Sequence, residues 1–482
     1  MIFSKSQQIA LSFIFFLGLL LRVVNIAHES LWFDEVVSLA FTTYSYTDLF
    51  SGNRYDPGNP WGYFLLLKAW FELTGLSGYG SRWLACLSYP LTLAATYLLA
   101  KKLSGADQRS TLLALILVAF SPPLIFLDRE ARVYTLFIPL MTYGLLLFFK
   151  ICEDHLDWKR WLLWVLIMCL GMTLHYYTIL IFIIQGIYLV IIYRNQLIAI
   201  ATRLVLSSAL IIISFAHYLP TFILQLEHGG DRYSFTWIYH LIFFPSYSLF
   251  GRTIVWKQEG ILWVGLLVGV TLILLLPLFF KIIQNREKFK RSGSFLIATV
   301  SFLILYSLYS PSISVRYLAW LIPLILIMVA MAWNAIKHRR FKFASAIGIT
   351  AMMLFSIWNI HNTKFKVDWV GLYAELEKYP SKELVVVGHQ MGEYVFRNFY
   401  QKHLNLKQEP YWTFPGAWET RKGSYQDFTE KIEGEKSFYF VKSSHPVNPP
   451  KYQQAMNKLE GTISMELLWK SRWLELYRCT RK

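Results

Sequence analysis

Two neighbouring carboxylates, Asp34 and Glu35, follow the first long apolar segment within the aromatic-rich stretch from Ser30 to Glu35. A carboxylate here could act as a general base, because a hydroxyl group is a poor nucleophile until its proton is removed. The pair is equally consistent with a solvated helix start, since acidic side chains are favourable in the first turn of a helix. The residues alone leave both interpretations open.

Arginines and tyrosines occur in further short segments between apolar runs. Arg132 and Tyr134 end the segment Asp128-Arg-Glu-Ala-Arg-Val-Tyr134, and Arg316 and Tyr317 follow a later turn. The guanidinium fork matches phosphate geometry, so these arginines could bind an anionic ligand. The alternatives are a hydrated turn with local ion pairs and an arginine that snorkels to the membrane surface.

One segment pairs a histidine with an aromatic residue, His175-Tyr176. These two residues are typical of an aromatic belt at a membrane interface as well as of a ligand site. A second histidine or acid is missing from the neighbouring sequence, so a local metal site is not predicted.

The composition indicates a membrane protein. Hydrophobic residues make up 55% of the chain, charged residues only 16%, and the mean hydropathy is +0.40. Such a chain has too little polar surface for a water-soluble fold. The net charge of +17 is explained by Lys and Arg on the cytoplasmic side of a membrane, so a nucleic-acid partner is not expected. The four cysteines are scattered and imply neither a zinc site nor a disulfide framework.

Runs of roughly 20 apolar residues predict about eleven membrane-spanning helices. They lie near 8–26, 82–100, 110–127, 133–149, 161–175, 177–193, 204–222, 260–280, 294–310, 317–335 and 343–360. With the N-terminus in the cytoplasm, Lys and Arg concentrate on the inner segments, so this orientation is predicted. The carboxylates, arginines and tyrosines above then share the outer face of the membrane.

We expect residues 1–360 to form the membrane domain and residues 361–482 a small extracytoplasmic α/β domain. The first outer loop, 27–81, should carry two amphipathic helices at the membrane surface, one ending near Phe50 and one over Trp61–Leu73. Within the C-terminal part, strands are predicted at 383–388, 437–441 and 473–477 and helices at 391–401 and 425–432.

The motifs, taken in order, resemble those of the C-type glycosyltransferases. The bacterial branch of the protein O-mannosyltransferase and lipid A aminoarabinose transferase superfamily is the most similar group. The resemblance rests on Leu31-Trp-Phe-Asp-Glu35, Asp56-Pro-Gly-Asn-Pro60 with Tyr63, Arg82, Arg129-Glu-Ala-Arg-Val-Tyr134, His175-Tyr176 and Arg316-Tyr317. One departure is that the usual proline pair of the second motif is interrupted.

The resemblance implies a polytopic α-helical protein of the cell (inner) membrane that takes a sugar from a polyprenyl-phosphate-linked donor. The acceptor would lie outside the cytoplasm and be a glycolipid, a polysaccharide or a protein. The transfer would invert the configuration at C1 of the sugar, with Asp34 as catalytic base and Glu35 assisting. Donor-phosphate contacts would come from Arg132, Arg316, Tyr134, Tyr317 and Arg82, and further substrate contacts from Asp56, Glu130, His175 and Tyr176. Some relatives use a divalent metal, so metal dependence stays open.

Two other classes fit parts of the pattern. A transporter or flippase of lipid-linked sugars would also carry arginines at headgroup depth, but it would be expected to place charges or broken helices near mid-membrane. An O-antigen ligase or polymerase would carry its catalytic groups in a long loop late in the chain. The C-terminal part would also fit a plain binding module.

Overall fold

The computed structural model describes residues 4–51, 59–76, 78–228, 244–251, 269, 280, 283–284, 286–309, 314–379, 384–388, 411–412, 435–443, 461–471 and 473–482. These form two compact units. Unit 1 comprises Met1–Val24, Tyr44–Gly75 and Gly80–His361, and unit 2 comprises Asn25–Thr43, Leu76–Tyr79 and Asn362–Lys482. The segment that carries Asp34 and Glu35 therefore groups with the C-terminal residues.

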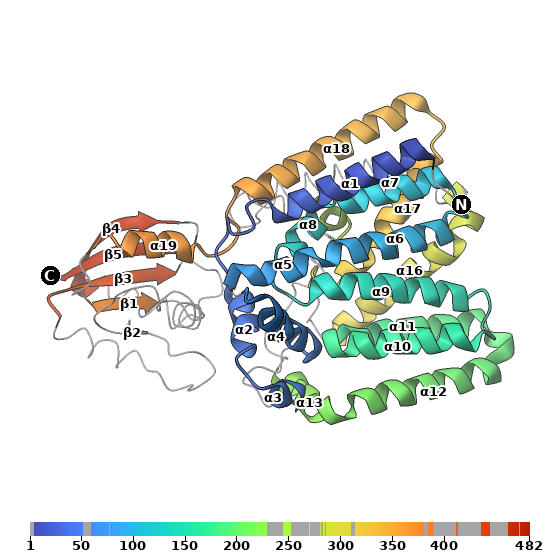
Figure 1. Cartoon of the computed structure of the whole chain (residues 1–482), viewed down its shortest axis with the longest axis horizontal. Coiled ribbons are helices and arrows are strands. Elements are labelled where there is room, and N and C mark those ends of the chain that lie inside the picture. Colours follow the sequence, from blue (N-terminus) through green and yellow to red (C-terminus); the bar gives the residue numbers. More distant parts are fainter. Residues whose placement is uncertain are drawn as a thin grey trace. The chain divides into compact units, whose positions relative to one another are not determined.

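Unit 1 is a bundle of helices (Figure 1). In chain order they are α1 (Lys5–Val23), α3 (Tyr46–Ser51), α4 (Gly62–Thr74), α5 (Ser81–Cys86), α6 (Ser88–Leu103), α7 (Gln108–Ala119), α8 (Pro122–Asp128), α9 (Tyr134–Ile151), α10 (Trp158–Leu174), α11 (Tyr177–Ile192), α12 (Leu197–Phe215), α13 (Leu219–His228), α16 (Arg286–Tyr309), α17 (Ile322–Asn334) and α18 (Arg339–Asn362).

Apart from α3 and α4, these helices overlap the predicted apolar runs; of the run at 260–280 the structure describes only residues 269 and 280. By length and composition, four of the described helices can cross a membrane: Gly78–Leu103, Tyr134–Ile151, Ile200–Ile223 and Arg339–Asn362. A fifth span results if α7 and α8, bent by 50° at their junction, count as one. Shorter apolar helices occupy further predicted runs, and the number of spans stays a prediction.

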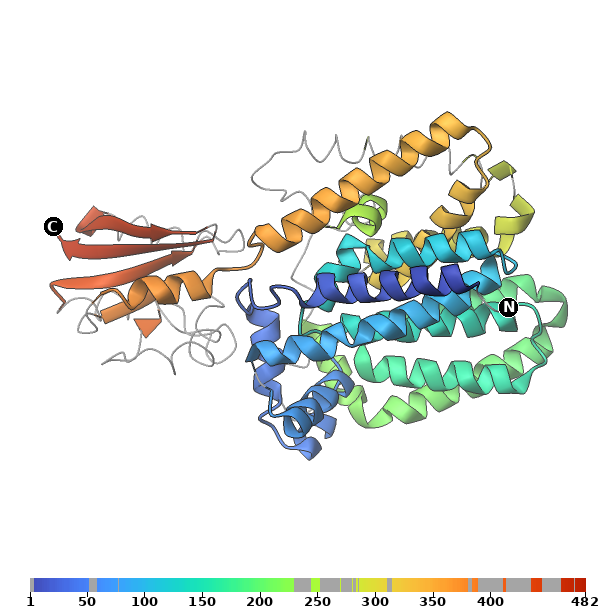
Figure 2. The ribbon, with the colours of Figure 1, turned by 45° about the horizontal axis from the view of Figure 1, so that its top comes forward.

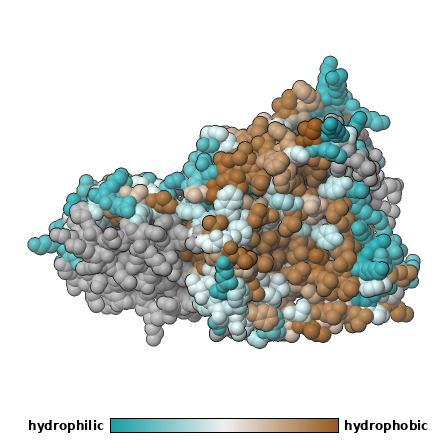
Figure 3. Space-filling model, viewed as in Figure 1, coloured by the Kyte–Doolittle hydropathy of each residue, from teal (hydrophilic) through white to brown (hydrophobic). Residues whose placement is uncertain are grey.

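The surface of unit 1 agrees with a lipid environment. Figure 3 shows a broad hydrophobic face over its helices, with hydrophilic side chains gathered at the edge where the N-terminus lies in Figure 1. Exposed Leu, Ile, Phe and Val side chains contribute to this surface, including Phe13, Phe16, Leu166 and Ile213. Contiguous apolar surface of this extent requires a non-aqueous partner.

Helix α9 is the centre of the bundle. It packs against α6 on one side and α10 on the other, and its first turn contacts the 3₁₀ turn Ala319–Leu321. Most of its side chains are buried, which is the expected position for a helix that is apolar on every face. The two ends of α9 are therefore fixed by its neighbours.

A buried ion pair joins the ends of four helices next to α9. Arg22 of α1 donates from Nε to Oδ2 of Asp128 at the end of α8, 2.6 Å away, and both side chains are almost fully buried. Ser88 at the start of α6 donates to Oδ1 of the same carboxylate, and Arg22 also bonds the Ala119 carbonyl at the end of α7. The Arg22 guanidinium lies 3.9 Å from the ring centroid of Tyr89.

Unit 2 contains a five-stranded sheet of order β2-β1-β3-β5-β4 (Figure 2). Strands β1 (Leu384–Gly388), β2 (Tyr411–Trp412) and β3 (Ser437–Ser443) are parallel, while β4 (Ile463–Lys470) and β5 (Leu474–Arg481) pair antiparallel to each other and β5 to β3. Helix α19 (Trp369–Leu376) contacts β4, because Gly371 lies against Trp469. Helix α2 (Phe33–Phe41) completes the described helices of this unit.

Three predicted strands are confirmed as β1, β3 and β5. Strand β4 was not predicted, because half of its side chains are exposed and a register shift between Leu467 and Trp469 interrupts its alternation. The very short β2 was also missed, and the helices predicted at 391–401 and 425–432 lie outside the described residues. Within residues 27–81, which are predicted to form the first outer loop, α4 confirms the helix predicted over Trp61–Leu73, whereas the preceding stretch forms the two short helices α2 and α3.

We predict that Arg22→Met destabilises the chain by about 3–5 kcal/mol, because it leaves the Asp128 carboxylate buried without its partner. Thermal unfolding in one detergent should show a lower midpoint for this variant. Arg160→Met is the matched control, since the Arg160–Asp157 pair is partly exposed and its loss should cost about 1 kcal/mol or less. Equal midpoints for the two variants would contradict the importance of the buried pair.

Candidate functional site

Three turns of unit 1 bring the predicted arginines and aromatic residues together. The ring centroid of His175 lies 5.7 Å from that of Tyr134 and 5.2 Å from that of Tyr317, and the two tyrosines are 6.1 Å apart. The Arg316 guanidinium lies 5.9 Å from the Tyr134 ring centroid, within cation–π range. We call Arg132, Tyr134, His175, Arg316 and Tyr317 the turn cluster.

His175 is held firmly between α10 and α11. Its backbone N–H donates to the Gly171 carbonyl at the end of α10, and its Nδ1 accepts from the Tyr177 backbone N–H at 3.1 Å. Because Nδ1 is an acceptor, a neutral ring carries its proton on Nε2. Burial lowers the pKa of His175 to about 3, and the nearby charge of Arg132 lowers it as well. His175 is therefore a neutral hydrogen-bond donor at physiological pH.

The charged turn before Tyr134 is buried. Asp128, Arg129, Glu130 and Arg132 are all shielded from solvent, so the interpretation as a hydrated turn is wrong. Arg129 donates to the Val24 carbonyl after α1 at 2.6 Å, and the Arg132 backbone N–H donates to the Glu130 carbonyl at 2.7 Å. The turn that carries Glu130 and Arg132 is thus fixed on both sides, by Asp128 and by α9.

Arg82 acts electrostatically on Cys86, as do both members of the Arg22–Asp128 ion pair. It is in the first turn of α5 and is fully buried. The thiol of Cys86 lies within electrostatic range of four charges, which are those of Arg22, Arg82, Arg129 and Asp128. This environment suits support of the charged turn as well as the predicted contact with donor phosphate.

Tyr176 belongs to a different group of rings. Its ring centroid lies 4.9 Å from that of Phe222 and 6.2 Å from that of Phe215. The next residue, Tyr177, contacts the turn cluster instead, with its ring 5.0 Å from Tyr317. The sequence motif does not distinguish the two tyrosines, because their directions depend on where α11 begins.

Gly62 was also missed by sequence reasoning. A Cβ at this position would lie 2.8 Å from the Thr173 carbonyl oxygen, closer than a side chain tolerates. Only glycine therefore lets α4 begin against the end of α10, two residues before His175. The neighbouring Asp56, a predicted substrate contact, lies outside the described residues.

The carboxylate pair lies in the first turn of α2, in unit 2. Glu35 is completely buried, and its Oε2 accepts from Lys366 Nζ at 3.0 Å and from the Trp32 backbone N–H at 3.3 Å. Asp34 is partly exposed, and its carbonyl accepts from the Ser38 hydroxyl. Two adjacent acids that look alike in sequence thus have different environments.

Within the part of the chain that the structure describes, no three His, Cys, Asp or Glu side chains are grouped so that they could hold a metal ion. The described residues of the turn cluster and of α2 therefore do not make up a metal site by themselves.

The fold is similar to that of solved C-type glycosyltransferases. Two structures of ArnT from Cupriavidus metallidurans align over 98% of both chains: the apo state, at 13% identity and a TM-score of 0.59, and the complex with undecaprenyl phosphate, at 12% and 0.58. The Archaeoglobus fulgidus oligosaccharyltransferase in complex with Zn and sulfate aligns over 90% of this chain and 67% of its own, at 12% identity and a TM-score of 0.53. The predicted class, a polytopic helical membrane protein with the fold of these enzymes, is confirmed.

In sequence, residues 58–219 match the family described as dolichyl-phosphate-mannose-protein mannosyltransferase. This range begins within the motif Asp56–Pro60 and includes Arg82, the charged turn and His175. No curated protein is similar enough in sequence to match the chain.

We predict that the stability of the protein falls with pH through His175. Below pH 6.5 the histidine of the unfolded chain binds a proton, whereas the buried ring of the folded chain does not. The free energy of unfolding should therefore decrease as the pH falls, by up to about 1.4 kcal/mol per pH unit. The decrease should end near pH 3, where the folded ring also binds a proton. In His175→Gln, the melting temperature should fall less between pH 7.5 and pH 5.5 than it does in the wild type. His338→Gln, at an exposed position, is the control and should leave the slope as in the wild type. A wild-type slope in His175→Gln would contradict the prediction.

Proposed function

We propose that the chain is a membrane glycosyltransferase that moves a sugar from a polyprenyl-phosphate-linked donor to an acceptor outside the cytoplasm. The observation that carries the proposal is the turn cluster, in which arginine, tyrosine and a neutral histidine from three turns meet in a chain with the ArnT fold. One solved structure of that fold is bound to undecaprenyl phosphate. The acceptor class, whether glycolipid, polysaccharide or protein, is left open.

In this proposal Arg316 and Arg132 bind the donor phosphate. Arg316 rests near the Tyr134 ring and lies within a turn that is closed by the Tyr317 backbone N–H bonding to the Ser314 carbonyl. A guanidinium held in this way can form two parallel hydrogen bonds to phosphate. Because His175 is neutral, the positive charge for the departing phosphate comes from the arginines, and Nε2–H of His175 can add a hydrogen bond.

Asp34 is proposed as the base. The acceptor hydroxyl oxygen would bond to C1 of the sugar on the face opposite the phosphate, the C1–phosphate oxygen bond would break, and the hydroxyl proton would pass to Asp34. The configuration at C1 would invert. Glu35 suits this step less well than Asp34, since its carboxylate is enclosed by Lys366 and the Trp32 amide.

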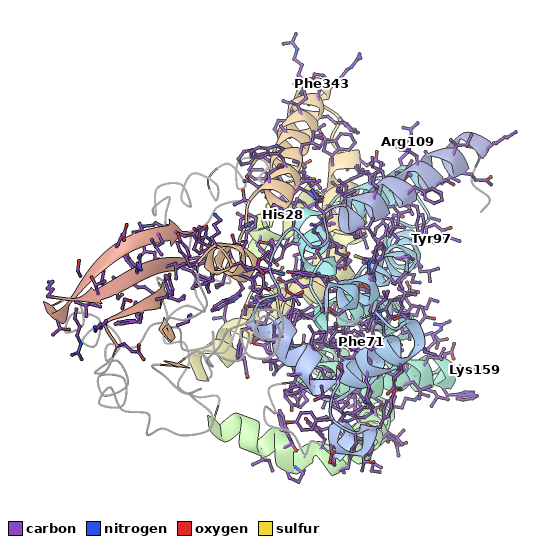
Figure 4. The ribbon with its side chains drawn as sticks, turned by 60° about the vertical axis from the view of Figure 1, so that its left-hand side comes forward. His28, Phe71, Tyr97, Arg109, Lys159 and Phe343 are labelled. Atoms are coloured by element: carbon purple, nitrogen blue, oxygen red, sulfur yellow. The ribbon has the colours of Figure 1, made fainter. Side chains whose placement is uncertain are left out.

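The proposed orientation has the N-terminus in the cytoplasm and residues 361–482 outside. Arg109 and Lys159, which the prediction places on cytoplasmic segments, both lie toward the right-hand edge of unit 1 in Figure 4. The orientation is proposed from the concentration of Lys and Arg on the predicted cytoplasmic segments.

Arg316→Ala should reduce sugar transfer by roughly tenfold to a hundredfold, because a charged hydrogen bond of this kind contributes ~1.5–3 kcal/mol. Arg316→Lys should also be impaired, since it keeps the charge and loses the fork. The assay would follow donor consumption in detergent with synthetic undecaprenyl-phosphate mannose, glucose and aminoarabinose and an acceptor-containing membrane fraction. Arg339→Ala, at an exposed position of α18, is the control. Undiminished transfer by Arg316→Ala would favour a snorkelling side chain, and absence of donor consumption by the wild type would favour a flippase.

Asp34→Asn should lower transfer about 10²–10⁴-fold while undecaprenyl phosphate still binds, because asparagine keeps the shape and cannot take the proton. Asp48→Asn is a matched control, since Asp48 is also an acid in the first turn of a short helix. If both variants lost activity equally, the helix-start interpretation of Asp34 would be correct. Full activity in Asp34→Asn would remove this residue from the mechanism.

A further inference from the structure

We propose that Lys366 is a positioning residue for Asp34, acting through Glu35. Residues 364–370, which we call the strap, follow α18 and include the first two residues of α19. The strap contacts the segment that leads into α2, and both belong to unit 2. The inference rests on the proposed function, because it concerns how the proposed base is held.

The Glu35–Lys366 ion pair fixes the first turn of α2. The two charged atoms are 3.0 Å apart, and the side chains are 0% and 6% exposed. Charges buried to this degree lose their hydration, so they are tolerated only with a well-placed partner. The Oε2 atom that faces Lys366 also accepts from the Trp32 backbone N–H, which caps the helix. Lys366 thus holds the carboxylate directly after Asp34.

Two further hydrogen bonds fix the chain just before α2. Oε1 of Glu29 accepts from the backbone N–H groups of Phe365 and Lys366, and the Ser30 hydroxyl oxygen accepts from the Val370 backbone N–H at 3.1 Å. These bonds join side chains of the incoming segment to the backbone of the strap. The contact therefore extends from residue 29 to residue 35 and does not depend on a single pair.

The strap is itself supported by the sheet and by α19. Trp473, beside the start of β5, donates from its indole N–H to the Phe365 carbonyl at 3.3 Å. Asp368 caps α19 by accepting from the Gly371 backbone N–H and forms an ion pair with Lys364 at 2.8 Å. Because both ends of the strap are held, it can act as a rigid support for α2.

Loss of the Lys366 charge would leave Glu35 buried and charged. The first turn of α2 would then have to open toward water, and Asp34, one residue earlier in the same turn, would move with it. A misplacement of about 1 Å can lower a catalysed rate by roughly 10²-fold. The C-terminal residues would thus control the base, in addition to any part in acceptor binding.

The test uses the full chain in detergent with Lys366→Met, Lys366→Arg and the double variant Lys366→Met with Glu35→Gln. Lys378→Met is the matched control, because Lys378 forms an exposed ion pair with Glu375 in α19. Three quantities are measured: hydrogen exchange of the backbone N–H groups of residues 33–41, kcat with the donor that the wild type uses, and the Kd of undecaprenyl phosphate.

We expect Lys366→Met to speed exchange in α2 about tenfold through local opening and to lower kcat about 10²-fold. The Kd of undecaprenyl phosphate should stay unchanged. Lys366→Arg should recover most of the activity because it restores the ion pair. The double variant removes both charges of the pair and should recover part of the loss, with kcat and exchange between those of Lys366→Met and the wild type.

Wild-type exchange in α2 of Lys366→Met would overturn the inference whatever the activity. A kcat equal to that of the wild type, in Lys366→Met or in the double variant, would also overturn it. So would a Kd for undecaprenyl phosphate that rises by the same factor as kcat falls. An inactive wild type, or a fully active Asp34→Asn, would instead overturn the proposed function. The exchange measurement would then still decide whether Lys366 holds α2.

Discussion

The buried Arg22–Asp128 ion pair is the interaction on which unit 1 depends. It joins the end of α1 to the end of α8, and through Ser88 and the Ala119 carbonyl it also includes α6 and α7. Its desolvation is costly, so the four helix ends must meet in one geometry for the pair to be stable. The charged turn begins at the next residue, and its course into α9 is therefore fixed before Arg132 and Tyr134 are reached.

A second buried pair has the same physical role in unit 2. Glu35 and Lys366 constrain the start of α2, and the bonds from Glu29 and Ser30 extend the contact along the strap. In both units an ion pair that is shielded from water sets the direction of the next part of the chain. The residues proposed to act on substrate, Arg132 and Asp34, lie within a few residues of these pairs, where small displacements matter most.

Burial also separates residues that the sequence treats alike. Asp34 and Glu35 are adjacent acids, yet one is partly exposed and the other is enclosed by Lys366. Tyr176 and Tyr177 are adjacent tyrosines, yet the first packs on Phe222 and the second on Tyr317. A sequence motif gives the order of side chains, whereas their directions follow from where a helix begins and what it packs against.

Apolar length and charge placement are local properties, so the sequence was enough to predict a polytopic membrane protein, the positions of most of its helices, and arginines and tyrosines between them. Its motif order also predicted the fold. The folded chain was needed to reveal that the turn at 128–132 is buried, that His175 is neutral, and that Glu35 is bound by a lysine 331 residues later in the chain. These features depend on contacts between distant segments, and neither periodicity nor composition records which segments meet.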